Sequence, residues 1–324
     1  MPRPLRVEYE GAFYHVMNRG LRHAPIFSDS EDRNLFFTTL NESVERFSIK
    51  IHAFALLDNH YHLLIETPQA NLGRAMRHVD GVYTQRYNRR HGLDGPLFRG
   101  RYKAQVIEEE QYLITLVAYI HLNPTRAGIE QQPQLPDRSS HSAFIGHTKK
   151  PHWLTCSFVL AHFSSINDFH QYILGMIQQI PEEHQRWDSE CWKSILGSEV
   201  FIARTMNMGE IREVDSHRPD IRRLFAMLCD PTHVLDLVSD KMGISKQDLS
   251  KRSRSPKILQ GQRIVATVLV RNFGLTHKRT ADVLGRKSPA TIGKMISDAE
   301  SDKESSAKKT ALLETLWASY TEKP

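Results

Sequence analysis

Residues 58–66, which read DNHYHLLIE, decide how the first part of this chain is interpreted. The apolar residues around the two histidines predict a β-strand that begins at His60. Residues i and i+2 of a strand point to the same face, so His60 and His62 should converge there. Two convergent imidazoles can supply part of an open metal site, but an isolated pair of this kind in a strand is more often structural or incidental. Further polar groups on the same face would favour the metal site.

The elements on both sides of this strand alternate between strands and helices. The Asp58-Asn59 pair predicts a tight turn that joins the His60 strand to the strand before it. Asp29 or Ser30 is the expected cap of the first helix. The order β-α-β-β-α-β predicts an α+β, ferredoxin-like fold with an antiparallel sheet. The expected strands are residues 12–20, 49–57, 60–66 and 100–108, and the expected helices are residues 30–47 and 72–90.

A further helix is expected from Glu110 to Leu122, with Pro124 ending it. Tyr119 and Asn123 are four residues apart, so they share a face of this helix. Taken alone, Tyr119 is read as a half-buried core residue and Asn123 as a helix terminus. His121 should lie at the surface or at the helix cap.

The composition is that of an ordinary globular protein. The chain has 324 residues, enough for two or three domains, and 40% are hydrophobic. No apolar run approaches the roughly 20 residues that a membrane-spanning helix needs. The N-terminus lacks a signal-peptide pattern, and the three cysteines are widely spaced. We therefore expect a cytoplasmic protein without a membrane partner.

The charge favours a polyanionic partner. The formal net charge is +6, and the basic residues gather in two regions. One cluster comprises Arg86, Arg89, Arg90, Arg99, Arg101 and Lys103, and the other comprises Lys251, Arg252, Arg254, Lys257 and Arg263.

Four motifs, in this order, resemble those of a known family. They are FYHV with NRG at residues 13–20, NHYHLL at 59–64, GPLFRGRYK at 95–103 and YIHLNPTRAG at 119–128. Together they resemble the single-tyrosine transposases of the HUH endonuclease superfamily, in the REP-associated branch. The resemblance covers about residues 1–150.

The resemblance implies a metal-dependent endonuclease and strand-transferase that acts on hairpin-forming, repetitive single-stranded DNA. His60, His62 and Asn123 would hold Mg²⁺ or Mn²⁺, and imidazole ligands suit manganese better. Tyr119 would attack the phosphorus and form a 5′-phosphotyrosine link. Many relatives carry Gln at the position of Asn123. The side chain of Asn is one methylene shorter than that of Gln. The protein would act as a monomer or a homodimer.

The same motifs carry residues that the resemblance places near DNA. His15 lies on the neighbouring strand, where it either orients a ligand or packs. The expected phosphate contacts are Arg19, Arg99, Arg101, Lys103 and Arg126.

Residues 233–300 are similar to the duplex-binding domain of the replication initiator DnaA. Ala281 and Leu284 precede a Gly285 turn, and Ile292 follows, which is helix-turn-helix spacing. In this chain SPAT at residues 288–291 replaces that family's recognition turn. A helical bundle with a basic face is the alternative. The expected DNA contacts are Lys251, Arg252, Arg254, Arg286, Lys287, Ser288 and Thr291.

We therefore predict four regions along the chain. Residues 1–150 form the transposase domain, 151–232 a helical connection, 233–300 the DNA-binding domain, and 301–324 a polar tail with a short helix. Two other functions stay open: an inactive, domesticated DNA-binding regulator, and an RNA-binding module that stacks bases on Tyr14 and Tyr61.

Overall fold

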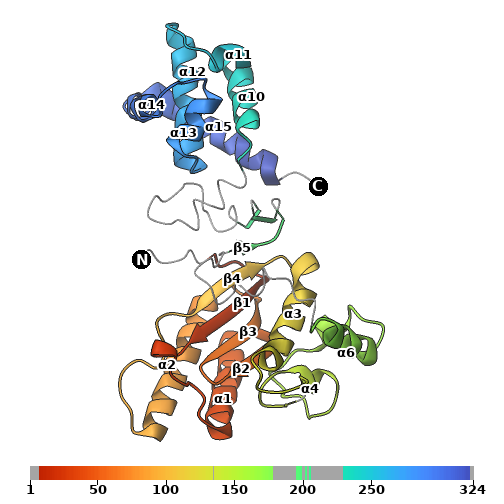
Figure 1. The fold of residues 1–324 in the computed structure, drawn as a ribbon. Coiled ribbons are helices and arrows are strands. Elements are labelled where there is room, and N and C mark those ends of the chain that lie inside the picture. The colour runs from red at the N-terminus through yellow and green to blue at the C-terminus, as the bar shows by residue number, and fades with distance from the viewer. Residues whose placement is uncertain are drawn as a thin grey trace. The chain divides into compact units, whose positions relative to one another are not determined.

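A computed structural model of the chain describes residues 7–133, 135–177, 195–198, 201–202, 204–205 and 229–321, with only the backbone at 109–111, 303–304, 306 and 317–321. Two compact units are present (Figure 1). One spans Arg6–Gly197, and the other combines Met1–Leu5 with Ser198–Pro324. Most of the predicted connection at 151–232 lies outside the described residues, and the predicted domain boundaries stay predictions.

A five-stranded sheet forms the centre of the first unit. Its strands are β1 (Ala12–Arg19), β2 (Lys50–Leu57), β3 (His60–Thr67), β4 (Lys103–Ile107) and β5 (Ile195–Leu196), in the order β2-β3-β1-β4-β5. The first four strands pair antiparallel, and β5 joins β4 in parallel. Helix α1 (Ser30–Phe47) follows β1, and α2 (Leu72–His91) follows β3. The α+β class is confirmed. The elements follow one another in the order β1-α1-β2-β3-α2-β4, and β5 was not predicted.

The two faces of the sheet carry different helices (Figure 1). Helices α1 and α2 cover one face, where Tyr61 donates a hydrogen bond to Asp80 of α2 and its ring contacts Phe36 of α1. Helix α3 (Glu109–Arg126) covers the other face, where the His62 ring meets Tyr119. Adjacent residues of β3 therefore point to opposite faces, as alternation predicts.

Small side chains allow α3 to approach the sheet. Ala53 and Ala55 of β2 pair with Leu64 and His62 of β3, and so lie on the α3 face. Both alanines are fully buried. Close packing of this kind leaves little space for larger side chains under α3.

The expected end of α3 at Pro124 is wrong. The helix continues to Arg126, with Pro124 inside its last turn. A proline loses one backbone hydrogen bond to the preceding turn. The backbone N–H groups of Ala127 and Ile129 still bond to the carbonyls of Asn123 and Pro124, which supports the last turn.

The first basic cluster is partly neutralised by acids of α1. Arg90 pairs with three carboxylates at the start of α1, at 2.6 to 2.8 Å, and Arg86 pairs with Glu42 at 2.6 Å. Asp29, one of those carboxylates, also caps α1 through the backbone N–H groups of Glu31 and Asp32. These arginines join α2 to α1.

The segment after α3 covers the edge of the sheet at β2. The backbone N–H of Leu56 donates to the carbonyl of Arg138, and the N–H of Phe54 donates to the Ser140 hydroxyl. Three short helices follow, α4 (His141–Phe144), α5 (Ser157–Leu160) and α6 (Ile166–Gly175).

His121 anchors α3 to this covering segment. Its side chain is fully buried, contrary to the expected surface position. Its Nε2 lies 2.8 Å from the Ser140 hydroxyl, and its Nδ1 lies 3.2 Å from Nδ1 of His141. His141 in turn contacts His170 of α6 at 2.9 Å.

The second unit is all-α over its described residues (Figure 1). Turns at Gly243, Gly274 and Gly285 have positive φ, as expected for these positions. The last helix begins at Lys303 and is longer than the predicted short helix, and Leu312 and Leu316 are buried on it. The elements are α10 (Pro231–Met242), α11 (Lys246–Leu249), α12 (Pro256–Thr267), the π-helical turn η3 (Val268–Asn272), α13 (His277–Val283), α14 (Ala290–Glu300) and α15 (Lys303–Thr321).

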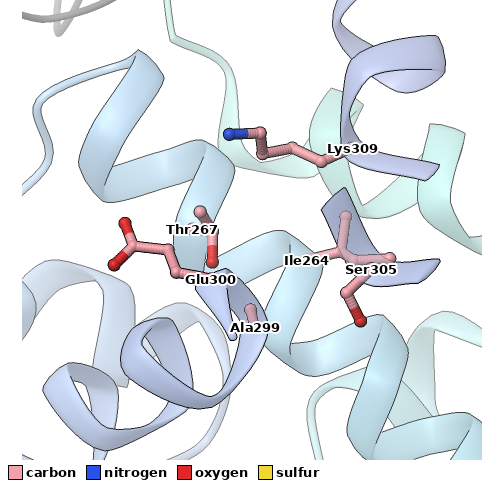
Figure 2. Close-up of a pocket in the computed structure, with 6 residues that line it drawn as sticks. All are labelled: Ile264, Thr267, Ala299, Glu300, Ser305 and Lys309. Carbon is pink, nitrogen blue, oxygen red and sulfur yellow. The ribbon is translucent and has the colours of Figure 1, made fainter. Parts of the chain in front are cut away.

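A small pocket lies among α12, α14 and α15 (Figure 2). Its volume of about 90 Å³ has room for only a few water molecules. Glu300, one of its lining residues, is paired with Arg271. This pocket is therefore not a candidate site. None of the described helices is both long and apolar enough to span a membrane.

Candidate active site

Two histidines and a tyrosine from distant parts of the chain meet between the sheet and α3. The rings of His60 and His62, both on β3, have centroids 5.1 Å apart. The Tyr119 ring of α3 meets the His62 ring edge-on at 5.5 Å. The structure thus brings together the predicted nucleophile and the predicted ligand pair.

The centre of this cluster is dry. His62 is 0% exposed and Tyr119 is 3% exposed, whereas His60 is half-buried. Burial lowers the pKa of His62 well below its usual value, and the neighbouring His15 and His60 lower it further. His62 is therefore a neutral imidazole at neutral pH, the form that can bind a metal ion.

The two nitrogens of His62 have different surroundings. Nδ1 lies 2.9 Å from Nε2 of His15. Nε2 is buried and has no hydrogen-bond partner among the described residues. A buried polar atom without a partner is costly, and a metal ion would satisfy it. The donor chemistry at His62 therefore fits a metal ligand.

Asn123 lies one helical turn beyond Tyr119 on α3 and is 9% exposed. No group of three His, Cys, Asp or Glu side chains among the described residues is arranged to hold a metal. The predicted set of His60, His62 and Asn123 contains two such side chains, and its third donor is an amide oxygen. The role of Asn123 stays a prediction.

Basic residues lie around the cluster. The Arg126 guanidinium lies over the Tyr119 ring, 5.8 Å from its centroid. Arg19 pairs with His60 across β1 and β3, and Lys103 begins β4 at the same end of the sheet. The backbone N–H of Arg99 bonds to the carbonyl of Arg19. With the exposed Arg101, the five predicted phosphate contacts lie along or beside this end of the first unit.

Sequence reasoning left two contributors unassigned. His15 was open between packing and orientation, and it contacts His62 directly. Asn59 lies 2.6 Å from His60, between its Oδ1 and the ring Nδ1. Both contacts depend on strand register and turn geometry.

The RNA-binding alternative is not supported at its key residues. Tyr14 is 1% exposed and Tyr61 is 0% exposed. A stacking platform for bases requires exposed rings. These two tyrosines are core residues.

The second unit presents an exposed basic surface. Six of the seven predicted DNA contacts are exposed: Lys251, Arg252, Arg254, Lys287, Ser288 and Thr291. Lys294, three residues after Thr291 on α14, is also exposed and was missed. Other basic side chains of this unit are neutralised, because Lys246, Arg263 and Arg271 pair with carboxylates.

Arg286 differs from its neighbours. Its side chain is half-buried and donates to the Gln262 side chain of α12. Burial, followed by the nearby Arg252, lowers its pKa. A Cβ at Gly285 would lie 2.1 Å from the carbonyl oxygen of Ser250, so this turn touches the loop before Lys251. Arg286 ties the turn to α12, and its contact with DNA stays a prediction.

Known proteins are similar to part of this chain. One solved structure, described as "Structure of the REP associates tyrosine transposase bound to a REP hairpin", is similar with a TM-score of 0.39 and 16% identity. The match covers 48% of this chain and 92% of that chain. No curated protein matches this chain.

A family profile covers the part of the chain that contains the cluster. Residues 8–123 match the family described as "Transposase IS200 like". This range includes both histidines, Tyr119 and Asn123. Residues 8–123 of this chain are therefore similar to the IS200-like transposase family.

Proposed function

We propose that this protein is a metal-dependent single-strand DNA endonuclease and strand-transferase that acts on hairpin-forming DNA. One observation carries the proposal: Tyr119 of α3 meets His62 of β3 at 5.5 Å, beside His60. His62 also presents a buried Nε2 that lacks a protein hydrogen bond among the described residues. A nucleophile beside a potential cation site is what phosphodiester cleavage requires.

The ligand set would be two imidazoles and one amide. His60, His62 and Asn123 would hold Mg²⁺ or Mn²⁺, whose charge would polarise an oxygen of the scissile phosphate. The two imidazoles favour Mn²⁺ over Mg²⁺. The ferredoxin-like sheet supplies the two histidines from one strand face, and α3 supplies the amide.

Tyr119 would act as the nucleophile. Its oxygen forms a bond to phosphorus while the bond from phosphorus to the 3′-oxygen breaks. The phenol gives up its proton, and the departing 3′-hydroxyl gains one. The product is a 5′-phosphotyrosine, and a second 3′-hydroxyl can reverse the step and join new ends. An unperturbed tyrosine has a pKa of about 10, so it depends on placement and nearby positive charge.

The surrounding cations would position the strand. Arg126 lies over the Tyr119 ring, and Arg19 lies opposite His60 in the β1–β3 strand register. Arg99, Arg101 and Lys103 continue this basic region, where phosphate contacts would fix the register of the DNA. A hairpin suits this arrangement, because its loop and flanks expose single strands without a cost of unpairing.

The second unit would bind duplex DNA. Helices α13 and α14 would form a helix-turn-helix similar to that of DnaA, with Ser288 and Thr291 at the start of the recognition helix. The exposed Lys251, Arg252, Arg254 and Lys287 would contact phosphates. This binding would bring the transposase domain to its DNA.

A labelled hairpin oligonucleotide with Mn²⁺ or Mg²⁺ tests the proposal. The wild-type chain should form a covalent adduct that retains the label on the 3′ side of the cut, and Tyr119→Phe should not. Tyr112→Phe is the matched control, since Tyr112 lies two turns earlier on α3. Binding without an adduct, with either metal, would instead support the inactive regulator.

A further inference from the structure

Both ligand histidines have a hydrogen-bond partner behind the ring. Nδ1 of His62 lies 2.9 Å from Nε2 of His15. Nδ1 of His60 lies 2.6 Å from Oδ1 of Asn59. In each case the contact involves Nδ1, and Nε2 is the ring nitrogen on the side away from that contact.

The orientation of Asn59 is defined by a second hydrogen bond. Its Nδ2 donates to the backbone carbonyl of His23 at 3.3 Å. The amide oxygen therefore faces His60. An amide oxygen only accepts, so Nδ1 of His60 must carry the hydrogen, and Nε2 carries the lone pair.

His15 can hold His62 in the same tautomer, with the hydrogen on Nδ1. The His15 and His62 rings are stacked, with centroids 5.1 Å apart and an interplanar angle of 10°. Both rings are fully buried, so water does not compete for their nitrogens. When Nε2 of His15 accepts, Nδ1 of His62 donates, and the buried Nε2 of His62 holds a lone pair.

Strand register fixes this pair. His15 lies on β1 opposite Leu64, two pairs along from His62, which lies opposite Met17. Neighbouring positions on one face of a sheet lie within reach of ring side chains. The β1–β3 pairing therefore places an imidazole behind one ligand, while the β2–β3 turn places an amide oxygen behind the other.

We propose that His15 and Asn59 are positioning residues that hold His62 and His60 as Nδ1–H tautomers, with both Nε2 lone pairs directed to one cation. The inference rests on the proposed metal site and goes beyond it by naming the groups that prepare that site before the cation arrives. Partners of this kind fix both the tautomer and the ring orientation, and their loss typically lowers metal affinity by about 10- to 100-fold.

The tautomers can be read in the metal-free full chain without DNA. Long-range ¹H–¹⁵N spectra of histidine-labelled protein, assigned with single-histidine variants, distinguish Nδ1–H from Nε2–H. Wild type should show Nδ1–H at both His60 and His62. An Nε2–H signal for His62 would overturn the role of His15, and the same signal for His60 would overturn that of Asn59.

Matched variants test the effect on metal binding. His15→Gln keeps an acceptor near the position of Nε2, whereas His15→Phe keeps the ring and removes the acceptor. Mn²⁺ titration calorimetry should show affinity near wild type for the first and about 10- to 100-fold weaker for the second. Asn59→Asp and Asn59→Leu form the corresponding pair for His60, and thermal unfolding checks that each variant is folded.

The outcomes separate this inference from the proposed function. If His15→Phe folds and binds Mn²⁺ like wild type, the positioning role is wrong even if wild type cleaves DNA. If the tautomers and affinities follow expectation but wild type forms no DNA adduct, the positioning role stands and the proposed chemistry fails. If wild type binds no Mn²⁺, both fail.

Discussion

Two tyrosines beside the histidine pair have opposite surroundings. Tyr61 lies between the two histidines in sequence, yet its hydroxyl donates to Asp80 on the other side of the sheet. Burial, and then Asp80, raises the pKa of Tyr61 well above its ordinary value. Tyr119 lies on the histidine side, under Arg126. Of these two tyrosines, Tyr119 is therefore the one that lies beside the histidine pair and a cation, as the proposed nucleophile should.

Arg286 and Lys287 are adjacent, and their substitutions should have different effects. Arg286→Ala removes a half-buried side chain bonded to Gln262, so it should lower the free energy of unfolding of the second unit by about 1–3 kcal/mol. Lys287→Ala removes an exposed charge, so stability should stay within about 0.5 kcal/mol of wild type. Urea unfolding of the full chain, followed by a probe in the second unit, measures both. Equal effects would show that Arg286 does not anchor the turn.

At the scale of elements, the contact between α3 and β2 sets the position of Tyr119. Ala55→Leu should lower the unfolding free energy by about 1–3 kcal/mol, because the added atoms have no space under α3. It should also reduce adduct formation by displacing Tyr119 from His62. Ala70→Leu, at an exposed position before α2, is the control. An unchanged adduct yield in a measurably destabilised Ala55→Leu would contradict this role of the contact.

The link between α3 and the edge-covering segment should be sensitive to acid. Burial lowers the pKa of His141 to about 3 and the pKa of His121 well below its ordinary value. Below about pH 6.5 the unfolded chain binds protons that the folded chain excludes. Stability should therefore fall with pH, by about 1.4 kcal/mol per pH unit for each such histidine, until the folded pKa is reached.

A variant isolates the contribution of His141. His141→Gln should reduce the slope of the unfolding free energy against pH between pH 6 and pH 4. The expected reduction corresponds to one bound proton, about 1.4 kcal/mol per pH unit. His152→Gln is the control, because His152 is 77% exposed. Chemical unfolding at a series of pH values gives the slopes, and equal slopes for wild type and His141→Gln would contradict the account.

Periodicity predicted the regular elements well and their irregular neighbours poorly. The strands β1 to β4 and the helices α1 and α2 lie within a few residues of expectation, because their apolar patterns are long. The two-residue strand β5 and the pairing of Arg138 and Ser140 along β2 have no periodic signal. Pro124 suggested a stop, but the last turn of a helix tolerates the loss of one bond.

The sequence likewise predicted some features of the candidate site and missed others. Alternation along β3 predicted that His60 and His62 share a face, and helical spacing paired Tyr119 with Asn123. The His15 contact depends on which strands pair, and local sequence does not specify that register. Linear sequence also placed Arg86 and Arg90 in the first basic cluster, whereas folding pairs both with acids of α1.

At the scale of the whole molecule, two compact units carry separate basic surfaces. In the second unit, the exposed cations lie around the α13–α14 turn and the loop at Lys251, while Arg263 and Arg271 are paired with acids. We therefore expect the exposed cations, and not the paired ones, to give salt-dependent duplex binding.

Substitutions in the full chain test this division. The double variant Arg252→Ala/Lys287→Ala should weaken duplex binding and reduce the slope of log affinity against log salt by about 0.9 for each lost phosphate contact. Arg271→Gln, which removes a paired charge, should leave the slope unchanged. Titrations at several salt concentrations provide the slopes, and a similar loss for both variants would show that overall charge, not this surface, binds the duplex.

The central claim is that Tyr119 joins the DNA. The most direct test is mass spectrometry of the trapped protein–oligonucleotide adduct after protease and nuclease digestion. The account predicts that the nucleotide remnant lies on the peptide that contains Tyr119, attached to the phenol oxygen. A remnant on Tyr112, on Tyr61 or on any other side chain would contradict it.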